Sequence, residues 1–162
     1  MRNSFYIFFT SLITAFSINF SLFAQELKIN SNEVKLNKKN SQVIFKGDVK
    51  AVDENNNTLL SDEANYKKDI DFLESVGKTK IITNQKYIFL SENVKFDNKN
   101  KIITSDYPTT ILDPDGNEID VEMFNYNSIN NILFSKGNIQ LSDKNNNIFK
   151  FSEIYIEEKS KK

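Results

Sequence analysis

Carboxylates are the side chains that could do chemistry in this chain, because the sequence contains no histidine and no cysteine. Their absence removes His-based acid–base catalysis, Ser-His-Asp and Cys-His nucleophilic schemes, and ordinary zinc sites. Asp62 and Glu63 are neighbours in a predicted strand, so their side chains point to opposite faces and cannot form a working pair. The residue types therefore argue against an enzyme.

The segment Asp113–Asn117 has the composition of a calcium loop, but its spacing does not fit one. An EF-hand loop places a glycine at its sixth position and a glutamate at its twelfth. Here Gly116 comes fourth, after a proline that presets φ for a turn. We interpret the segment as a hairpin turn, and we find no glycine loop that could cradle a phosphate.

Strand signals dominate the chain from Leu27 onward. Leu27–Ile29, Val34–Leu36 and Val43–Ala51 alternate apolar and polar residues, as a half-buried strand does. Clusters of Asn, Asp and Lys separate these runs, and such residues favour turns. Roughly a dozen or more strands, with a turn signal about every 8 to 12 residues, predict an all-β sandwich, roll or barrel.

A repeat is visible in the glycines, since three of only four lie at fixed intervals. Gly47, Gly77 and Gly137 are separated by 30 and then by 60 residues, and each lies within an alternating stretch. A constant period indicates one supersecondary unit used repeatedly, here a strand pair. A glycine within a strand marks a bulge or a bend. The sequence therefore predicts repeated antiparallel hairpins whose bends make the sheet roll.

The N-terminus predicts export. Residues 1–24 have a short positive start, an apolar stretch and a small residue before Gln25, which is typical of a secretory signal peptide, although an uncleaved anchor of similar length is the alternative. Cleavage would leave 25–162 as one domain. Lys and Arg then number 20 against 22 Asp and Glu, and this balance argues against nucleic acid as a partner.

Apolar residues of one parity would line one face of the rolled sheet. A filled core is the simpler interpretation, whereas a sheet left open at both ends would form a trough for an acyl chain, whose burial is worth about 0.8 kcal/mol per CH₂. Open edge strands could also pair with another chain. The residues on this predicted face are Leu27, Ile29, Val34, Leu36, Val43, Phe45, Val49, Leu60, Tyr66, Phe72, Phe89, Val94, Phe96, Tyr126, Phe134, Ile139 and Leu141.

Several motifs together resemble the OstA/LptA-like lipopolysaccharide-transport domains. Leu27–Asn32 and Val43–Val49 are similar to the opening of those domains, an apolar-x-apolar-x-Ser-Asp/Asn segment followed by Phe-x-Gly-Asn/Asp-Val. Ser61–Tyr66 and Leu133–Ile139 resemble the next strand and the second glycine hairpin. The similarity runs from about Leu27 to Ile156.

The resemblance implies a twisted, open β-jellyroll that carries lipopolysaccharide acyl chains without catalysis or a cofactor. It implies edge-to-edge stacking with other jellyroll domains, or head to tail with itself, as a periplasmic bridge toward the outer membrane. It also places Leu27 and Ile29 at the groove mouth, and Ile82 and Tyr126 in the interior. The candidate lipid-groove residues are Leu27, Ile29, Leu36, Val43, Phe45, Val49, Tyr66, Phe72, Ile82, Phe89, Phe96, Tyr126, Phe134, Ile139 and Leu141.

Two alternatives remain open at this point. The chain could be the periplasmic front domain of a truncated or split outer-membrane barrel protein of the same transport system. It could instead be a structural β-repeat protein with a dry, packed interior and no ligand.

Overall fold

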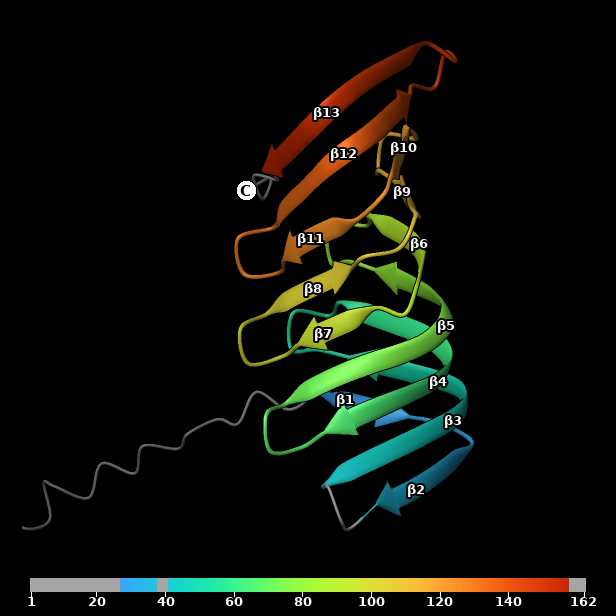
Figure 1. Cartoon of the computed structure of the whole chain (residues 1–162), viewed down its shortest axis with the longest axis vertical. Coiled ribbons are helices and arrows are strands. Elements are labelled where there is room, and N and C mark those ends of the chain that lie inside the picture. The colour runs from blue at the N-terminus through green and yellow to red at the C-terminus, as the bar shows by residue number, and fades with distance from the viewer. Residues whose placement is uncertain (1–26, 38–40, 158–162) are drawn as a thin grey trace, which may run out of the picture.

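The computed structural model describes residues 27–37 and 41–157, and the predicted signal segment lies outside them. The described residues form strands and turns without helix, which confirms the predicted all-β fold (Figure 1). All strand pairings are antiparallel. The strands are β1 (Lys28–Asn30), β2 (Glu33–Asn37), β3 (Gln42–Val52), β4 (Thr58–Lys67), β5 (Phe72–Ile82), β6 (Ile88–Glu92), β7 (Lys95–Asp97), β8 (Ile102–Ser105), β9 (Thr109–Leu112), β10 (Glu118–Val121), β11 (Phe124–Asn127), β12 (Ile132–Ser142) and β13 (Ile148–Glu157).

These strands form a simple meander of bent segments. The long strands β3, β4, β5, β12 and β13 each pass through a bend, whereas β6–β7, β8–β9 and β10–β11 are bent segments interrupted at the bend. For example, β5 pairs with β6 through its second half and with β7 through its first half. Each bent segment therefore pairs with the next one along the chain, from β1–β2 to β13.

The bend divides the sheet into two facing walls. The first wall holds β1, β6, β9 and β10 with one half of each long strand, and the second wall holds β2, β7, β8 and β11 with the other halves. In Figure 1 the bend of β3, β4 and β5 lies on the right and the turns of the second wall lie on the left. We call the space between the walls the trough and its long side opposite the bend the mouth.

Bulges at the glycines produce the bend, as the sequence predicts. The ladder between β3 and β4 shifts register between Lys46 and Val49, and that between β12 and β13 shifts between Lys136 and Ile139. Gly47 and Gly137 lie within these shifts with φ of 71° and 118°. L-residues avoid this region of φ because Cβ approaches the backbone, so glycine meets the need of the bulge.

Buried hydroxyl groups form hydrogen bonds with backbone groups where the strands bend. Ser75 Oγ accepts from the Val94 amide at 2.8 Å, and Ser135 Oγ donates to the Met123 carbonyl at 2.7 Å. Ser105 Oγ donates to the Glu92 carbonyl at 2.8 Å. Because a buried backbone group without a partner is costly, these hydroxyls stabilise the interrupted strands.

The turns at the mouth recur every 30 residues. Asp53, Asp113 and Asp143 each accept hydrogen bonds from the backbone N and the Nδ2 of the asparagine four residues later. The structure thus confirms that Asp113–Asn117 is a hairpin turn, closed by the Asp113 amide donating to the Asn117 carbonyl at 3.0 Å.

Candidate functional site

Most of the candidate residues line the trough. Leu27, Val49, Phe89, Phe96, Tyr126 and Ile139 are buried, and Ile29, Val43, Phe45, Tyr66 and Leu141 are partly buried. Leu36 is 63% exposed, yet it pairs with Val43, which in turn pairs with Tyr66, so it belongs to the same inner face. Whether these side chains contact lipid stays a prediction.

Three candidates, Phe72, Ile82 and Phe134, lie on the outer face instead of the inner face. So does Leu60, which belongs to the longer list of residues predicted for the apolar face. The inner positions belong to their chain neighbours Leu59, Leu73, Ile81 and Leu133, which are at most 2% exposed. Phe72, Ile82 and Phe134 are each adjacent to one of these buried residues, and successive side chains of a strand point to opposite faces. At each of these positions two apolar residues are adjacent in the sequence, so the alternation of apolar and polar residues does not show which of the two points inward. Cross-strand pairing decides it, and the predicted inward placement was wrong for Phe72, Ile82, Phe134 and Leu60.

The 30-residue period relates inner residues to one another, and among them parity alone found Phe89 and missed the others. Leu73, Ile103 and Leu133 are spaced by 30 and all are buried, as are Leu59, Phe89 and Ile119. Comparing each apolar residue with the residues 30 positions before and after it would have found these two sets. The repeat is therefore a better guide to the inner face than the alternation within any one strand.

The centre of the trough is filled with side chains. Phe89 lies 4.8 Å from Phe124 and 5.7 Å from Tyr126, centroid to centroid, so one aromatic cluster joins the two walls. Phe124 and Ile111 have no exposed surface. This packing is that of an ordinary core.

Both ends of the trough are open, in contrast to the centre. Val34 and Leu36 on β2 are 58% and 63% exposed, and Phe149 and Phe151 on β13 are 47% and 43% exposed. Phe149 and Phe151 pair with Leu141 and Ile139, so they continue the inner face. Among the described residues, β13 pairs only with β12, and β1 and β2 pair only with β3. Each end therefore presents an apolar inner face beside a strand that has a neighbouring strand on one side only, among the described residues.

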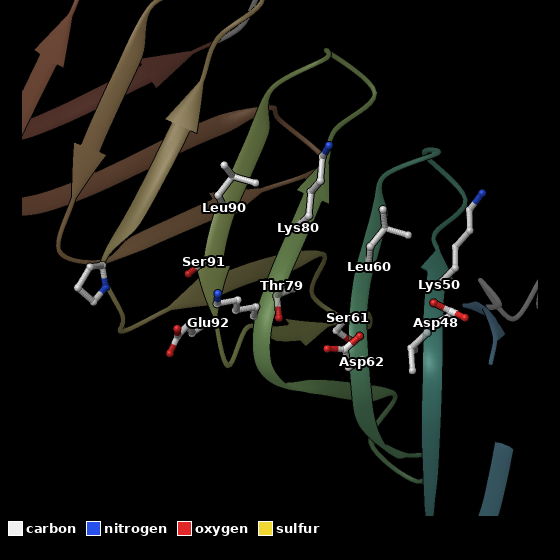
Figure 2. Close-up of a pocket in the computed structure, with 13 residues that line it drawn as sticks. Asp48, Lys50, Leu60, Ser61, Asp62, Thr79, Lys80, Leu90, Ser91 and Glu92 are labelled. Carbon is white, nitrogen blue, oxygen red and sulfur yellow. The ribbon is translucent and has the colours of Figure 1, made fainter. Parts of the chain in front are cut away.

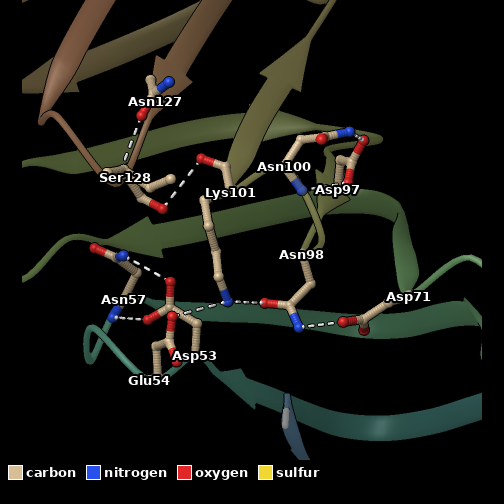
Figure 3. A network of polar contacts seen from close by, with 11 residues as sticks. Asp53, Glu54, Asn57, Asp71, Asp97, Asn98, Asn100, Lys101, Asn127 and Ser128 are labelled. Atoms are coloured by element: carbon tan, nitrogen blue, oxygen red, sulfur yellow. Dashed lines mark hydrogen bonds and ion pairs between the residues drawn. The ribbon is translucent and has the colours of Figure 1, made fainter. Parts of the chain in front are cut away.

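A polar network spans the mouth near mid-length. Lys101, in the β7–β8 turn of the second wall, is 2% exposed, and its Nζ lies 3.3 Å from Glu54 Oε1 in the β3–β4 turn of the first wall (Figure 3). Lys101 Nζ also donates to Asn98 Oδ1 at 2.8 Å, and Asn98 Nδ2 donates to Asp71 Oδ2 at 2.6 Å. The network joins the rims of the two walls and covers the core beneath it.

A hollow of about 790 Å³ lies on the outer side of the first wall near the bend (Figure 2). Its outward side chains mix both charges with two leucines, Leu60 and Leu90. Charged side chains of this number are typical of an outer sheet face and do not suit an acyl-chain site. The charged residues that line it are Asp48, Lys50, Asp62, Lys78, Lys80 and Glu92.

Across residues 27–37 and 41–157, no group of three or more acidic residues is placed to hold a metal ion. In the same part of the chain, no helix is long and apolar enough to cross a membrane.

Comparisons with known proteins support the fold. No protein-family description and no curated protein sequence match the chain. A solved structure does: the chain is similar to LptH of Pseudomonas aeruginosa, described as the LptA-homologous periplasmic component of the conserved lipopolysaccharide transport device. The TM-score is 0.60 at 13% sequence identity, over 78% of this chain and 94% of that one. The chain therefore has the fold of this LptA homologue.

Proposed function

We propose that this chain is a non-catalytic carrier that binds the acyl chains of lipopolysaccharide in the periplasm and passes them along its trough. One observation carries the proposal. The apolar inner face runs from β2 to β13 and is left unsealed at both ends, where Val34, Leu36, Phe149 and Phe151 are exposed. An apolar surface that the fold could have covered but leaves open suits a ligand or a partner.

The energetics favour a lipid. Each buried CH₂ group contributes about 0.8 kcal/mol, so several carbons of an acyl chain laid on an open end would bind measurably. The likeness to LptH supports this class of ligand, since that protein belongs to a lipopolysaccharide transport device. A periplasmic location also agrees with the export signal predicted in residues 1–24, outside the described residues.

The edges suit pairing with other jellyroll domains or with a second copy. Both β1–β2 and β13 run from the first wall through the bend to the second wall. Stacking two copies head to tail with their walls aligned would therefore place β13 of one copy parallel to β1–β2 of the next. The inner faces would then form one continuous apolar surface, and the two edge strands would pair through their backbones.

Photocrosslinking with matched inner and outer positions tests the lipid. A benzophenone amino acid replaces Phe45 or Phe151 on the inner face, and its neighbours Lys46 or Lys150 on the outer face serve as controls. We expect lipopolysaccharide adducts in cells from the two inner positions and none from the controls. Adducts that form equally at Lys46 and Lys150 would reject the proposal. Tyr126 is a poorer position because it is 2% exposed.

A structural β-repeat protein with a dry interior is the second candidate, and the filled centre favours it. The cluster of Phe89, Phe124 and Tyr126 leaves little room between the walls. Native mass spectrometry after gentle purification separates the two candidates. A carrier retains lipid mass, and a dry repeat protein does not.

A further inference from the structure

Lys101 departs from the repeat that organises the rest of the second wall. The equivalent positions 30 residues before and after are Asp71 and Asn131, and all three residues adopt positive φ, between 52° and 58°. Asp71 accepts a hydrogen bond from Tyr66 at 2.7 Å, and Asn131 accepts one from Tyr126 at 3.0 Å. At both flanking positions, the side chain therefore closes its own hairpin.

The middle hairpin lacks that local bond. Phe96 occupies the position of Tyr66 and Tyr126 and has no hydroxyl group, so it cannot donate to residue 101. In its place, Lys101 extends across the mouth to Glu54 on the opposite rim. The repeat could have supplied a tyrosine and an acceptor here, as it does on both sides. The pair of Phe96 and Lys101 is thus a departure that the fold itself does not require.

We call the ion pair of Lys101 with Glu54 the strap, and the turns that carry it are fixed on both rims. Ser128 donates to the Lys101 carbonyl from its amide at 2.9 Å and from its Oγ at 3.1 Å, which fixes the turn that carries the lysine. On the other rim, Asn57 is bound to Asp53 and accepts from the Asn84 amide at 3.0 Å, which fixes the turn that carries Glu54. Of the four ion pairs among the described residues, this one joins the two rims.

We propose that Lys101 determines where an acyl chain enters the trough, by closing the mouth at mid-length through its ion pair with Glu54. Chains then enter at the two open ends. They reach the centre only when this pair separates and the side chains of Phe89, Phe124 and Tyr126 move aside. The acyl-chain part rests on the function proposed above, whereas the closure of the mouth does not.

The chemistry of the pair suits a closure that can open. A buried lysine needs a counter-charge, because an unpaired ammonium is poorly tolerated away from water. Glu54 is 37% exposed, so water or an incoming group can reach it from outside while Lys101 stays covered. Loss of Glu54 as a partner would draw Lys101 toward solvent and break the link between the two rims.

Hydrogen exchange of the lipid-free protein tests the closure. In Glu54→Gln we expect exchange at the Asn57 and Ser128 amides to quicken about tenfold, while the β4–β5 ladder stays unchanged. Adding Lys101→Met removes the buried charge but does not restore the pair, so we expect exchange at the Asn57 amide to stay fast. Unchanged exchange in Glu54→Gln, or slow exchange at Asn57 in the double variant, would overturn the closure by the ion pair.

A repeat-like variant guards against general unfolding. Phe96→Tyr with Lys101→Asn gives the middle hairpin the same local bond as its neighbours and removes the strap. We expect this variant to unfold cooperatively on heating, as a folded domain does, and to show fast hydrogen exchange at the Asn57 amide. If Glu54→Gln quickens exchange at all amides, the repeat-like variant tests the closure instead. Slow exchange at the Asn57 amide of the repeat-like variant would then reject the closure.

Labelling by a long-chain fatty acid that carries a diazirine tests the acyl-chain part. We expect the wild type to be labelled in β1–β4 and β13, and the repeat-like variant to gain labels in β6–β11. Equal central labelling in both proteins would overturn the role of Lys101 in access. No labelling of any variant would instead remove the proposed lipid function, and the exchange result would then stand by itself.

Discussion

The centre and the ends of the trough are built from the same repeat but have opposite surfaces. Phe89 and Phe149 occupy equivalent positions 60 residues apart, yet Phe89 is 1% exposed and Phe149 is 47% exposed. The difference arises from neighbours: β6 is flanked by β5 and β9, whereas β13 has β12 on one side and nothing described on the other. One repeat therefore forms core where it is flanked on both sides and an exposed apolar surface where it is not.

The largest effect is expected when the equivalent phenylalanines of the centre and the end are each replaced by alanine. Phe89→Ala should lower the free energy of unfolding by about 3–5 kcal/mol, because it leaves a cavity in the aromatic cluster. Phe149→Ala should cost less than about 1 kcal/mol, since that ring is half exposed and loses little burial. Urea unfolding of both variants measures the contrast. Equal losses would show that the ends are packed as tightly as the centre.

A second test concerns the bend that both regions share. Gly77 has φ of 73°, and no atom lies within 4 Å of a Cβ built there. Gly77→Ala should therefore cost about 1–2 kcal/mol through backbone strain alone. Gly77→Asn should cost less, because asparagine tolerates this region better. Thermal unfolding ranks the two variants. A stabilising Ala would mean that β5 does not need the bulge.

A third test separates the inner and outer faces of the open end. Phe151→Lys should weaken self-association about tenfold, because stacking would bury the new charge. Ile148→Lys, on the outer face of the same strand, should leave association unchanged. Sedimentation velocity over a concentration series measures both. A monomeric wild type, or equal loss in the two variants, would contradict stacking through the inner face.

The smallest effect is expected at the exposed turn of the end hairpin. Hydrogen bonding from the Asn147 side chain, and next from its backbone amide, lowers the pKa of Asp143. Because the folded pKa is depressed, the stabilisation is present above the unfolded pKa and is lost as pH falls through the folded pKa. In Asn147→Ala the pKa of Asp143 should move back toward its ordinary value. Carboxyl NMR titration checks this, and an unmoved pKa would exclude the side-chain bond as the cause.

Local patterns in the sequence predict the fold well, because the signals act over a few residues. Alternation, turn-forming Asn and Asp, and glycines in bulges each constrain the backbone near themselves. They fail at apolar doublets such as Phe72 with Leu73, where two adjacent residues compete for one inward position. There the register with β4, which pairs Leu73 with Tyr66, decides the outcome.

The strap could not be predicted from the sequence. Lys101 lies in a turn rich in Asn and Lys, where a solvated side chain is the ordinary expectation. Its partner Glu54 lies 47 residues earlier, on a strand pair that does not contact β8 in the sheet. Only the fold of the two walls brings the two turns together.

By itself, the sequence determined that the chain is an all-β meander with a 30-residue period, because strand alternation and turn chemistry are local properties of the backbone. The tertiary structure alone decided which equivalent positions became core, which stayed open at the ends, and which turns met across the mouth. These depend on what lies beside each strand and opposite each rim, and such neighbours are set by register and curvature over the whole sheet.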